Sequence, residues 1–86
     1  MVSKRMSAAR ALQLVRRAAR KRGLSVVELH KRGKGSHRMY ALVDAEDREI
    51  ERFGLTDHPG DISWLVLRRL EERLTEVFGG GWMEER

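Results

Sequence analysis

Two breaks in the sequence constrain the fold of this chain more than any other feature. The first, at Gly23, follows a segment with helical periodicity and precedes two segments with the composition of strands. The second, at Pro59 and Gly60, precedes a leucine-rich segment with helical periodicity. Because proline and glycine interrupt both helices and strands, the chain divides into a helix, a strand region and a second helix. This order favours an α+β fold.

The segment between Ser7 and Gly23 is expected to form the first helix. Apolar residues recur in it at steps of three and four, which is the helical period. They are Ala8, Ala11, Leu12, Val15, Ala18 and Ala19. Ser7 is suited to cap the first turn and Gly23 to end the last one. Because the stripe is mostly alanine, we expect this helix to lie close against a sheet.

Two extended segments, 24–31 and 37–43, surround the glycine-rich loop 32–36 and predict an antiparallel hairpin. The pairs expected on its apolar face are Leu29 with Met39, Val27 with Ala41 and Ser25 with Val43. The pairs expected on the other, partly solvated face are His30 with Arg38, Glu28 with Tyr40 and Val26 with Leu42. The alternation of side chains along a strand separates these two sets.

A third strand is predicted over 49–55, where the apolar residues are Ile50, Phe53 and Leu55. Asp61 or Ser63 can cap a second helix that ends near Phe78. Its apolar stripe consists of Leu67, Leu70, Leu74, Val77 and Phe78. Its start, from Ile62 through Trp64 to Leu67, is apolar nearly all round and is expected to be deeply buried.

These segments predict one domain over 1–86, with a core at about 7–78 and a glycine-rich tail at 79–86. The expected architecture is a two-layer αβββα sandwich, in which both helices cover one face of a three-stranded antiparallel sheet. Trp82 in the tail either folds back onto the domain or anchors a partner. A chain of 86 residues cannot build a large core.

Charge is distributed unevenly along the chain. The net charge is +5, but residues 1–22 hold eight basic residues and no acid, whereas residues 44–61 hold seven acids and two arginines. Such a distribution suggests a basic face that meets a polyanion. The alternative is that the basic residues only solvate the outer face of a helix. A mitochondrial transit peptide fits less well, because removing the segment would leave too little to fold.

Several function classes are disfavoured by what the sequence lacks. Without cysteine there is no disulfide, no thiol nucleophile and no cysteine-ligated zinc. The three histidines show neither HxH nor HExxH spacing, so we expect no metal and no cofactor. The GxSxG turn of serine hydrolases and the complete Walker loop are both missing. No apolar run reaches the length of a membrane span, and no secretory signal is recognisable, so a soluble cytoplasmic protein is expected.

The hairpin loop is the best candidate for chemistry. It leads into His37, with basic residues around it at Lys31, Arg32, Lys34 and Arg38. Glycines let backbone N–H groups approach a phosphate closely, and a histidine can exchange a proton with a ribose 2′-hydroxyl or with a leaving oxygen. The residues alone leave open that His37 is a partly exposed packing residue.

The segment from Lys34 to Tyr40, which reads Lys-Gly-Ser-His-Arg-Met-Tyr, resembles the Gly-Ser-His hairpin of HicA toxins from HicA/HicB toxin–antitoxin systems. The order of elements over about 7–74 is also similar to that family. The resemblance implies a fold like that of double-stranded-RNA-binding domains and the activity of an mRNA interferase. It implies that His37 is the catalytic histidine and that a HicB-like antitoxin covers it. The first helix here is more basic than is usual in the family, and Trp82 onwards has no counterpart in it.

We therefore expect a toxin of a type II system that cleaves mRNA without metal through His37. The residues expected to bind RNA or phosphate are Lys31, Arg32, Lys34, Gly35, Ser36, Arg38, Arg16 and Arg20. His58 is either a second acid–base group or a loop residue near the second helix. The alternative function is a non-catalytic module that binds RNA or an antitoxin. A DNA-binding regulator is less well supported, because the sheet separates the two helices.

Overall fold

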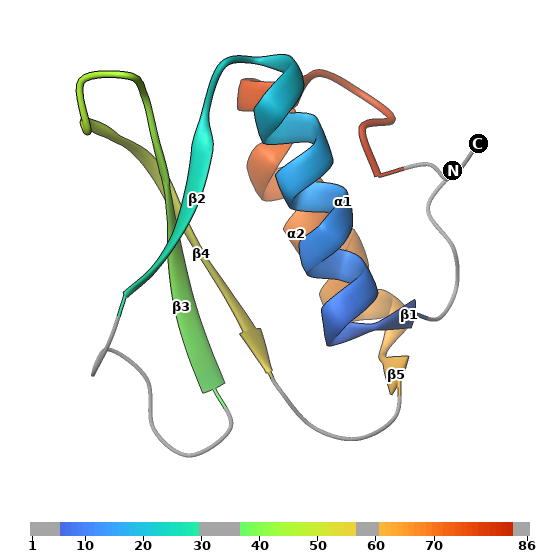
Figure 1. The fold of residues 1–86 in the computed structure, drawn as a ribbon. Coiled ribbons are helices and arrows are strands. Elements are labelled where there is room, and N and C mark those ends of the chain that lie inside the picture. The colour runs from blue at the N-terminus through green and yellow to red at the C-terminus, as the bar shows by residue number, and fades with distance from the viewer. Residues whose placement is uncertain (1–5, 30–36, 57–60, 84–86) are drawn as a thin grey trace.

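The protein is an α+β domain with a three-stranded antiparallel sheet and two helices on one of its faces, as predicted (Figure 1). A computed structural model describes residues 6–29, 37–56 and 61–83, and for residues 37, 56 and 61 it describes the backbone alone. The helices are α1 (Ala8–Lys21) and α2 (Trp64–Phe78), and the sheet has the order β2 (Ser25–Leu29), β3 (His37–Val43), β4 (Glu49–Thr56). Among the described residues, neither helix has the length and apolar character of a membrane span.

The ends of α1 are set by the residues that the sequence indicates. The hydroxyl of Ser7 accepts a hydrogen bond from the backbone N–H of Arg10 at 3.1 Å, which caps the first turn. At the other end, Gly23 adopts φ 71°, and the N–H of Leu24 returns to the carbonyl of Ala19 at 2.8 Å. The fully or nearly fully buried residues of the helix are Ala11, Leu14, Val15, Ala18 and Ala19. The small alanines let α1 approach the sheet closely.

The predicted register of the hairpin is confirmed for the pairs that the structure describes, whereas the predicted pair of His30 with Arg38 lies outside the described residues. Ser25 pairs with Val43, Val27 with Ala41 and Leu29 with Met39 in β2 and β3. On the other side of β3, β4 pairs antiparallel from His37 opposite Thr56 as far as Val43 opposite Glu49. A bulge between Leu42 and Val43 shifts this register near its end. Ile50, which lies at the bulge, is exposed, although Phe53 and Leu55 of the same strand are buried.

The prediction of which sheet face is buried is wrong. Tyr40 and Leu42 are buried in the core beneath the helices, whereas Val27, on the face expected to be apolar, is 45% exposed. The third strand, β4, determines which face of the sheet is buried, because the large side chains of Phe53 and Leu55 share a face with Tyr40 and Leu42. The rings of Tyr40 and Phe53 stack at a centroid distance of 5.3 Å. The helices therefore cover the face that carries the aromatic pair.

A second, two-stranded sheet was not predicted. It pairs β1 (Met6–Ser7) with β5 (Asp61–Ile62) in antiparallel orientation, so that Met6 lies opposite Ile62. Because β1 leads directly into α1 and β5 into α2, the pair holds the N-terminal ends of both helices together (Figure 1). The two helices therefore run in the same direction, and both begin at the end of the molecule where β3 begins.

Ser63 caps α2, and the helix ends at Phe78 as predicted. The expectation that its first turn is deeply buried is wrong, because Trp64, Leu65 and Val66 are 40 to 51% exposed. A helix turns by about 100° per residue, so three consecutive residues cannot share one buried stripe. The stripe instead follows the residues Leu67, Leu70, Leu74 and Phe78. Trp64 lies against the guanidinium of Arg68, at 5.2 Å from the ring centroid.

The segment after α2 folds back onto the domain. The indole N–H of Trp82 donates a hydrogen bond to the carbonyl of Glu71 at 2.9 Å, and its ring meets that of Phe78 edge to face at 5.1 Å. Met83 is fully buried and joins the core, as does Met6, so the core reaches just beyond 7–78. Of the two alternatives for Trp82, the structure has the fold-back contact.

Candidate nucleic-acid interface

The candidate catalytic residue, His37, is the first residue of β3 and pairs with Thr56, the last residue of β4. The start of β3, the end of β4 and the N-terminal end of α1 lie at the same end of the molecule (Figure 1). The remaining residues of the predicted hairpin site, and both other histidines, lie outside the described residues. They are His30, Lys31, Arg32, Lys34, Gly35, Ser36 and His58.

Arg38 is the predicted phosphate ligand whose surroundings the structure describes. Together with Tyr40 and Leu55 it lines a hollow of about 280 Å³ against the first residues of α1, among them Ala8 and Leu12. Its guanidinium forms an ion pair with the carboxylate of Glu28 at 3.0 Å, and both side chains are partly exposed, at 48% and 33%. An ion pair this exposed is worth at most about 1 kcal/mol, so a phosphate can compete with Glu28 for Arg38.

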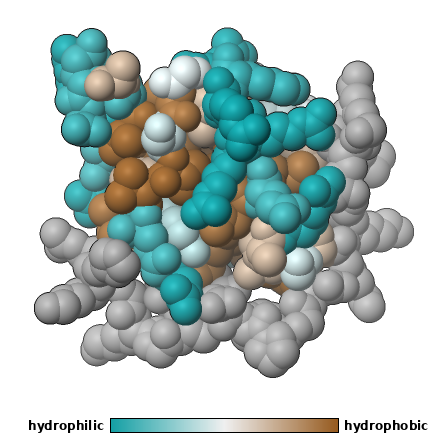
Figure 2. Space-filling model, in the orientation of Figure 1, coloured by the Kyte–Doolittle hydropathy of each residue, from teal (hydrophilic) through white to brown (hydrophobic). Residues whose placement is uncertain are grey.

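The outer face of α1 is the most strongly basic surface that the structure describes. Its exposed cationic residues are Arg10, Arg16, Arg17, Arg20 and Lys21. The helix contains no acidic residue, and none of the ion pairs among the described residues involves a cation of 16–21. Figure 2 shows a hydrophilic band over α1, beside a hydrophobic area over β2. Arg16, Arg17, Arg20 and Lys21, which have no ion-pair partner among the described residues, form a surface suited to a polyanion.

The predicted binding residues on α1 do not cluster around the start of β3. With a rise of about 1.5 Å per residue, Arg16 lies about 12 Å along the helix axis from Ala8, and Arg20 about 18 Å. The structure therefore brings Arg38 close to the N-terminal end of α1 but leaves Arg16 and Arg20 farther along it. The cations of the candidate interface are therefore spread along α1 and do not surround a compact pocket.

The parallel helices add positive potential at the end where β3 begins. Each helix N-terminus carries a partial charge of about +0.5, and a first-turn Asp or Glu would offset it. Neither α1 nor α2 has an acid in its first turn. This contribution was not predicted, although the absence of acids from both first turns is visible in the sequence.

The acidic part of the chain is at the other end of the sheet. The turn between β3 and β4 is built on Asp44, whose carboxylate accepts hydrogen bonds from the N–H groups of Glu46 and Arg48, each at 2.9 Å. In β4, Glu49 contacts Arg52 at 2.6 Å, and this contact raises the pKa of Arg52 above its ordinary value. The acids of this turn thus lie away from the start of β3 and from the candidate histidine.

Two further observations bear on the site. Among residues 6–29, 37–56 and 61–83, no group of three or more histidine, aspartate or glutamate side chains is placed to hold a metal ion. In comparisons with known proteins, no family model, no curated protein and no solved structure matches this chain.

Proposed function

We propose that this protein is a metal-independent endoribonuclease that binds RNA along α1 and cleaves it at His37. One observation carries the proposal: Arg16, Arg17, Arg20 and Lys21, which have no ion-pair partner among the described residues, lie on a helix whose N-terminal end adjoins Arg38, the residue next to His37. A strand of RNA held along this helix would reach the start of β3 with its phosphates already neutralised. The Gly-Ser-His sequence at that point supplies a histidine suited to proton transfer.

The reaction is a transesterification within the RNA strand. The 2′-oxygen of one nucleotide attacks the adjacent phosphorus and loses its proton, and the bond from phosphorus to the 5′-oxygen of the next nucleotide breaks as that oxygen gains a proton. The products are a 2′,3′-cyclic phosphate and a 5′-hydroxyl. His37 acts as the base or the acid in this exchange, with water as the other proton carrier, while Lys34 and Arg38 stabilise the charge on the phosphate.

The attacking 2′-hydroxyl makes the reaction specific for RNA over DNA. The resemblance of the segment from Lys34 to Tyr40 to the HicA hairpin supports a narrower form of the proposal. In that form the protein is the toxin of a type II toxin–antitoxin system, its substrate is mRNA in the cytoplasm, and a HicB-like antitoxin neutralises it. This assignment needs neither a metal nor a small-molecule cofactor.

Incubation of RNA with the wild-type protein and with the variant His37→Ala tests the proposal. The wild type is expected to leave 2′,3′-cyclic phosphate ends in the presence of EDTA, and the variant to leave none. His30→Ala serves as the matched control, because it removes a neighbouring histidine from the same hairpin. Equal cleavage by wild type and His37→Ala, or a requirement for magnesium, would contradict the proposed mechanism.

The same experiment distinguishes the proposed endoribonuclease from the alternative function. A non-catalytic module that binds RNA or an antitoxin would show salt-dependent RNA binding with no cleavage, and its expression would not arrest growth. If wild type and His37→Ala bind RNA equally and neither cleaves it, the alternative replaces the proposal.

A further inference from the structure

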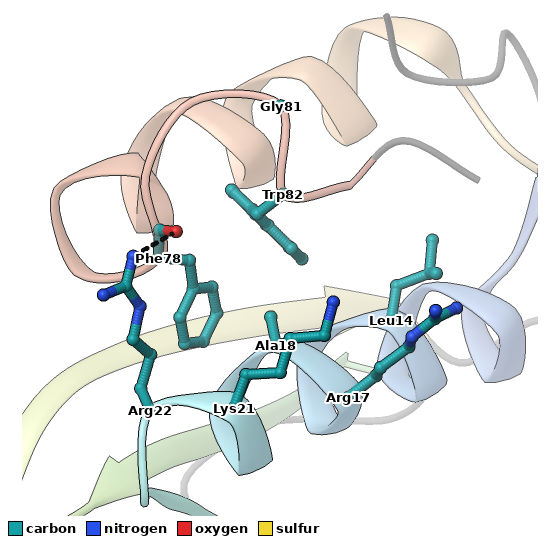
Figure 3. Close-up of a pocket in the computed structure, with 8 residues that line it drawn as sticks. All are labelled: Leu14, Arg17, Ala18, Lys21, Arg22, Phe78, Gly81 and Trp82. Carbon is teal, nitrogen blue, oxygen red and sulfur yellow. Dashed lines mark hydrogen bonds between the residues drawn. The ribbon is translucent and has the colours of Figure 1, made fainter. Parts of the chain in front are cut away.

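A second candidate site lies away from the start of β3, between the C-terminal half of α1 and the segment after α2. It is a pocket of about 390 Å³, within the size range of pockets that bind small molecules. Its lining residues are Leu14, Arg17, Ala18, Lys21, Arg22, Phe78, Gly81 and Trp82. Figure 3 shows Trp82 and Phe78 reaching toward α1 from one side, and Leu14 and Ala18 facing them from the other.

The walls of this pocket are held in place by contacts that do not depend on a ligand. Trp82 is fixed by the hydrogen bond of its indole N–H to the carbonyl of Glu71, and Met83, the next residue, is buried in the core. On the opposite side, the guanidinium of Arg22 donates to the carbonyl of Phe78 at 3.1 Å and joins the end of α1 to the end of α2 (Figure 3). The pocket is therefore preformed, which lowers the entropic cost of binding.

The lining defines the chemistry of the ligand. Leu14, Ala18 and the two aromatic rings offer apolar surface for a flat or apolar group. Arg17 and Lys21 supply two positive charges, and among the described residues neither has an ion-pair partner. A ligand that uses both features carries an apolar, preferably aromatic, body and a negative charge next to it.

We propose that this pocket binds an unpaired nucleotide of RNA, with the base against Trp82 and the adjacent phosphate on Arg17 and Lys21. Aromatic side chains that stack bases, combined with a basic groove that follows the backbone, are the general means by which proteins hold single-stranded nucleic acid. An acidic peptide is the competing ligand. RNA fits better, because Arg16 and Arg20 continue the row of cations outside the pocket and would meet the phosphates of the neighbouring nucleotides.

This pocket makes the proposed function more specific, because it predicts that the protein binds RNA in single-stranded form. It rests on that proposal for the identity of the ligand but not on cleavage. Arg17 lies about 14 Å along α1 from Ala8, at a rise of about 1.5 Å per residue, so the bound base belongs to a nucleotide away from the bond that is cut. The pocket anchors the strand and sets its position relative to His37.

Tryptophan fluorescence provides a direct test, because the chain has two tryptophans and only one lines the pocket. The variant Trp64→Leu removes the exposed tryptophan at the start of α2 and leaves Trp82 as the sole fluorophore. The probe is a 2′-O-methyl RNA octamer containing all four bases, which cannot be cleaved through the 2′-oxygen. The octamer is expected to quench this fluorescence, whereas an abasic octamer with the same phosphates is not.

Binding measurements on matched variants complete the test. The wild type and Trp64→Leu are expected to bind the octamer about tenfold more tightly than the abasic octamer, and Trp82→Leu to lose this preference. The double variant Arg17→Gln/Lys21→Gln is expected to bind both probes more weakly. Its binding constant should also depend less steeply on salt concentration, by the amount that corresponds to the loss of about two contacts with phosphates. A thermal melt of each variant separates loss of the pocket from loss of the fold.

Equal quenching of Trp82 by the base-bearing and abasic octamers would overturn the proposal. So would stronger quenching by a glutamate-rich peptide containing leucine or phenylalanine than by the RNA octamer, since the pocket would then be a peptide site. These outcomes are independent of the cleavage assay. A protein whose Trp82 is quenched by the base-bearing octamer but that does not cut RNA contradicts the proposed function alone. One that cuts RNA without base-dependent quenching of Trp82 contradicts the pocket proposal alone.

Discussion

Replacing Met83 by alanine should destabilise the whole domain, although Met83 follows the last helix in a glycine-rich segment. Its side chain is fully buried and belongs to the same core as Leu67 and Leu74 of α2. The change removes three buried heavy atoms, each worth about 0.8 kcal/mol of transfer free energy by analogy with a methylene group. Because the segment after α2 can partly collapse into the space, the expected loss lies toward the lower end of the usual range, at about 2 to 3 kcal/mol.

This loss is large for a domain of this size. At about 0.05 to 0.15 kcal/mol per residue, the free energy of unfolding of 86 residues is about 4 to 13 kcal/mol. Each kcal/mol corresponds to about 4 to 8 °C of melting temperature, so Met83→Ala should lower the Tm by about 10 to 20 °C. Circular dichroism during heating, and urea titration at 25 °C, measure the two quantities independently.

Leu65→Ala is the matched control, because it removes a similar volume from a residue that is 51% exposed in the first turn of α2. We expect a change of under about 0.5 kcal/mol, since alanine also favours the helix. If Met83→Ala costs no more than Leu65→Ala, the segment after α2 is not part of the core, and the walls of the pocket at Trp82 are not preformed.

Three further predictions follow from the fold. Leu42→Ala should destabilise the domain by about 2 to 4 kcal/mol and Val27→Ala by under about 1 kcal/mol in urea titrations, and the reverse order would contradict the assignment of the buried sheet face. Glu28→Gln should remove one negative charge next to Arg38 and raise RNA affinity a few-fold at low salt in fluorescence polarisation, whereas an unchanged or lower affinity would show that Arg38 does not contact RNA. Gly23→Ala should lower the free energy of unfolding by about 1 kcal/mol in a thermal melt. The cost comes from the backbone, since φ is 71° at this position and a Cβ there would meet no atom within 4 Å. A stabilising effect would show that the left-handed conformation of Gly23 does not end α1.

The elements and the hairpin register could be predicted from the sequence because local signals determine them. Ser7 and Ser63 each cap a helix with their hydroxyl, and Gly23 ends the first helix in a left-handed conformation. The predicted five-residue loop 32–36 determines which residues of the two flanking strands lie opposite each other, and it gave the pairing of Val27 with Ala41 that the structure has. Each of these features depends on residues that are close in the sequence.

The buried face of the sheet could not be predicted from the hairpin alone. Both faces of β2 and β3 carry apolar residues, and the choice between them depends on Phe53 and Leu55 in β4. The β1–β5 pair is a non-local feature of the same kind, since Met6 and Ile62 each belong to a segment too short to show strand periodicity. The exposure of Trp64 also has a tertiary cause, because the position of α2 on the sheet selects the stripe through Leu67.

The candidate site was predictable in part. The basic character of α1 and its place in the chain are visible in the sequence, whereas the ion pair of Arg38 with Glu28 required the register and the side-chain positions. The pocket at Trp82 could not be found from spacing. It joins residues of α1 to residues about 60 positions later, and its signal in the sequence is a single tryptophan after three glycines.

The β1–β5 pair has a consequence for how the molecule fluctuates. It contains two residues per strand, so it opens at a lower free energy than the three-stranded sheet, in which β3 is bonded on both sides. One such opening releases the starts of α1 and α2 at once and leaves the pairing of β3 with β2 and β4 intact. Such an opening also exposes the core residues Met6 and Ile62, so it is a local unfolding of this end of the molecule and not a rigid movement of it.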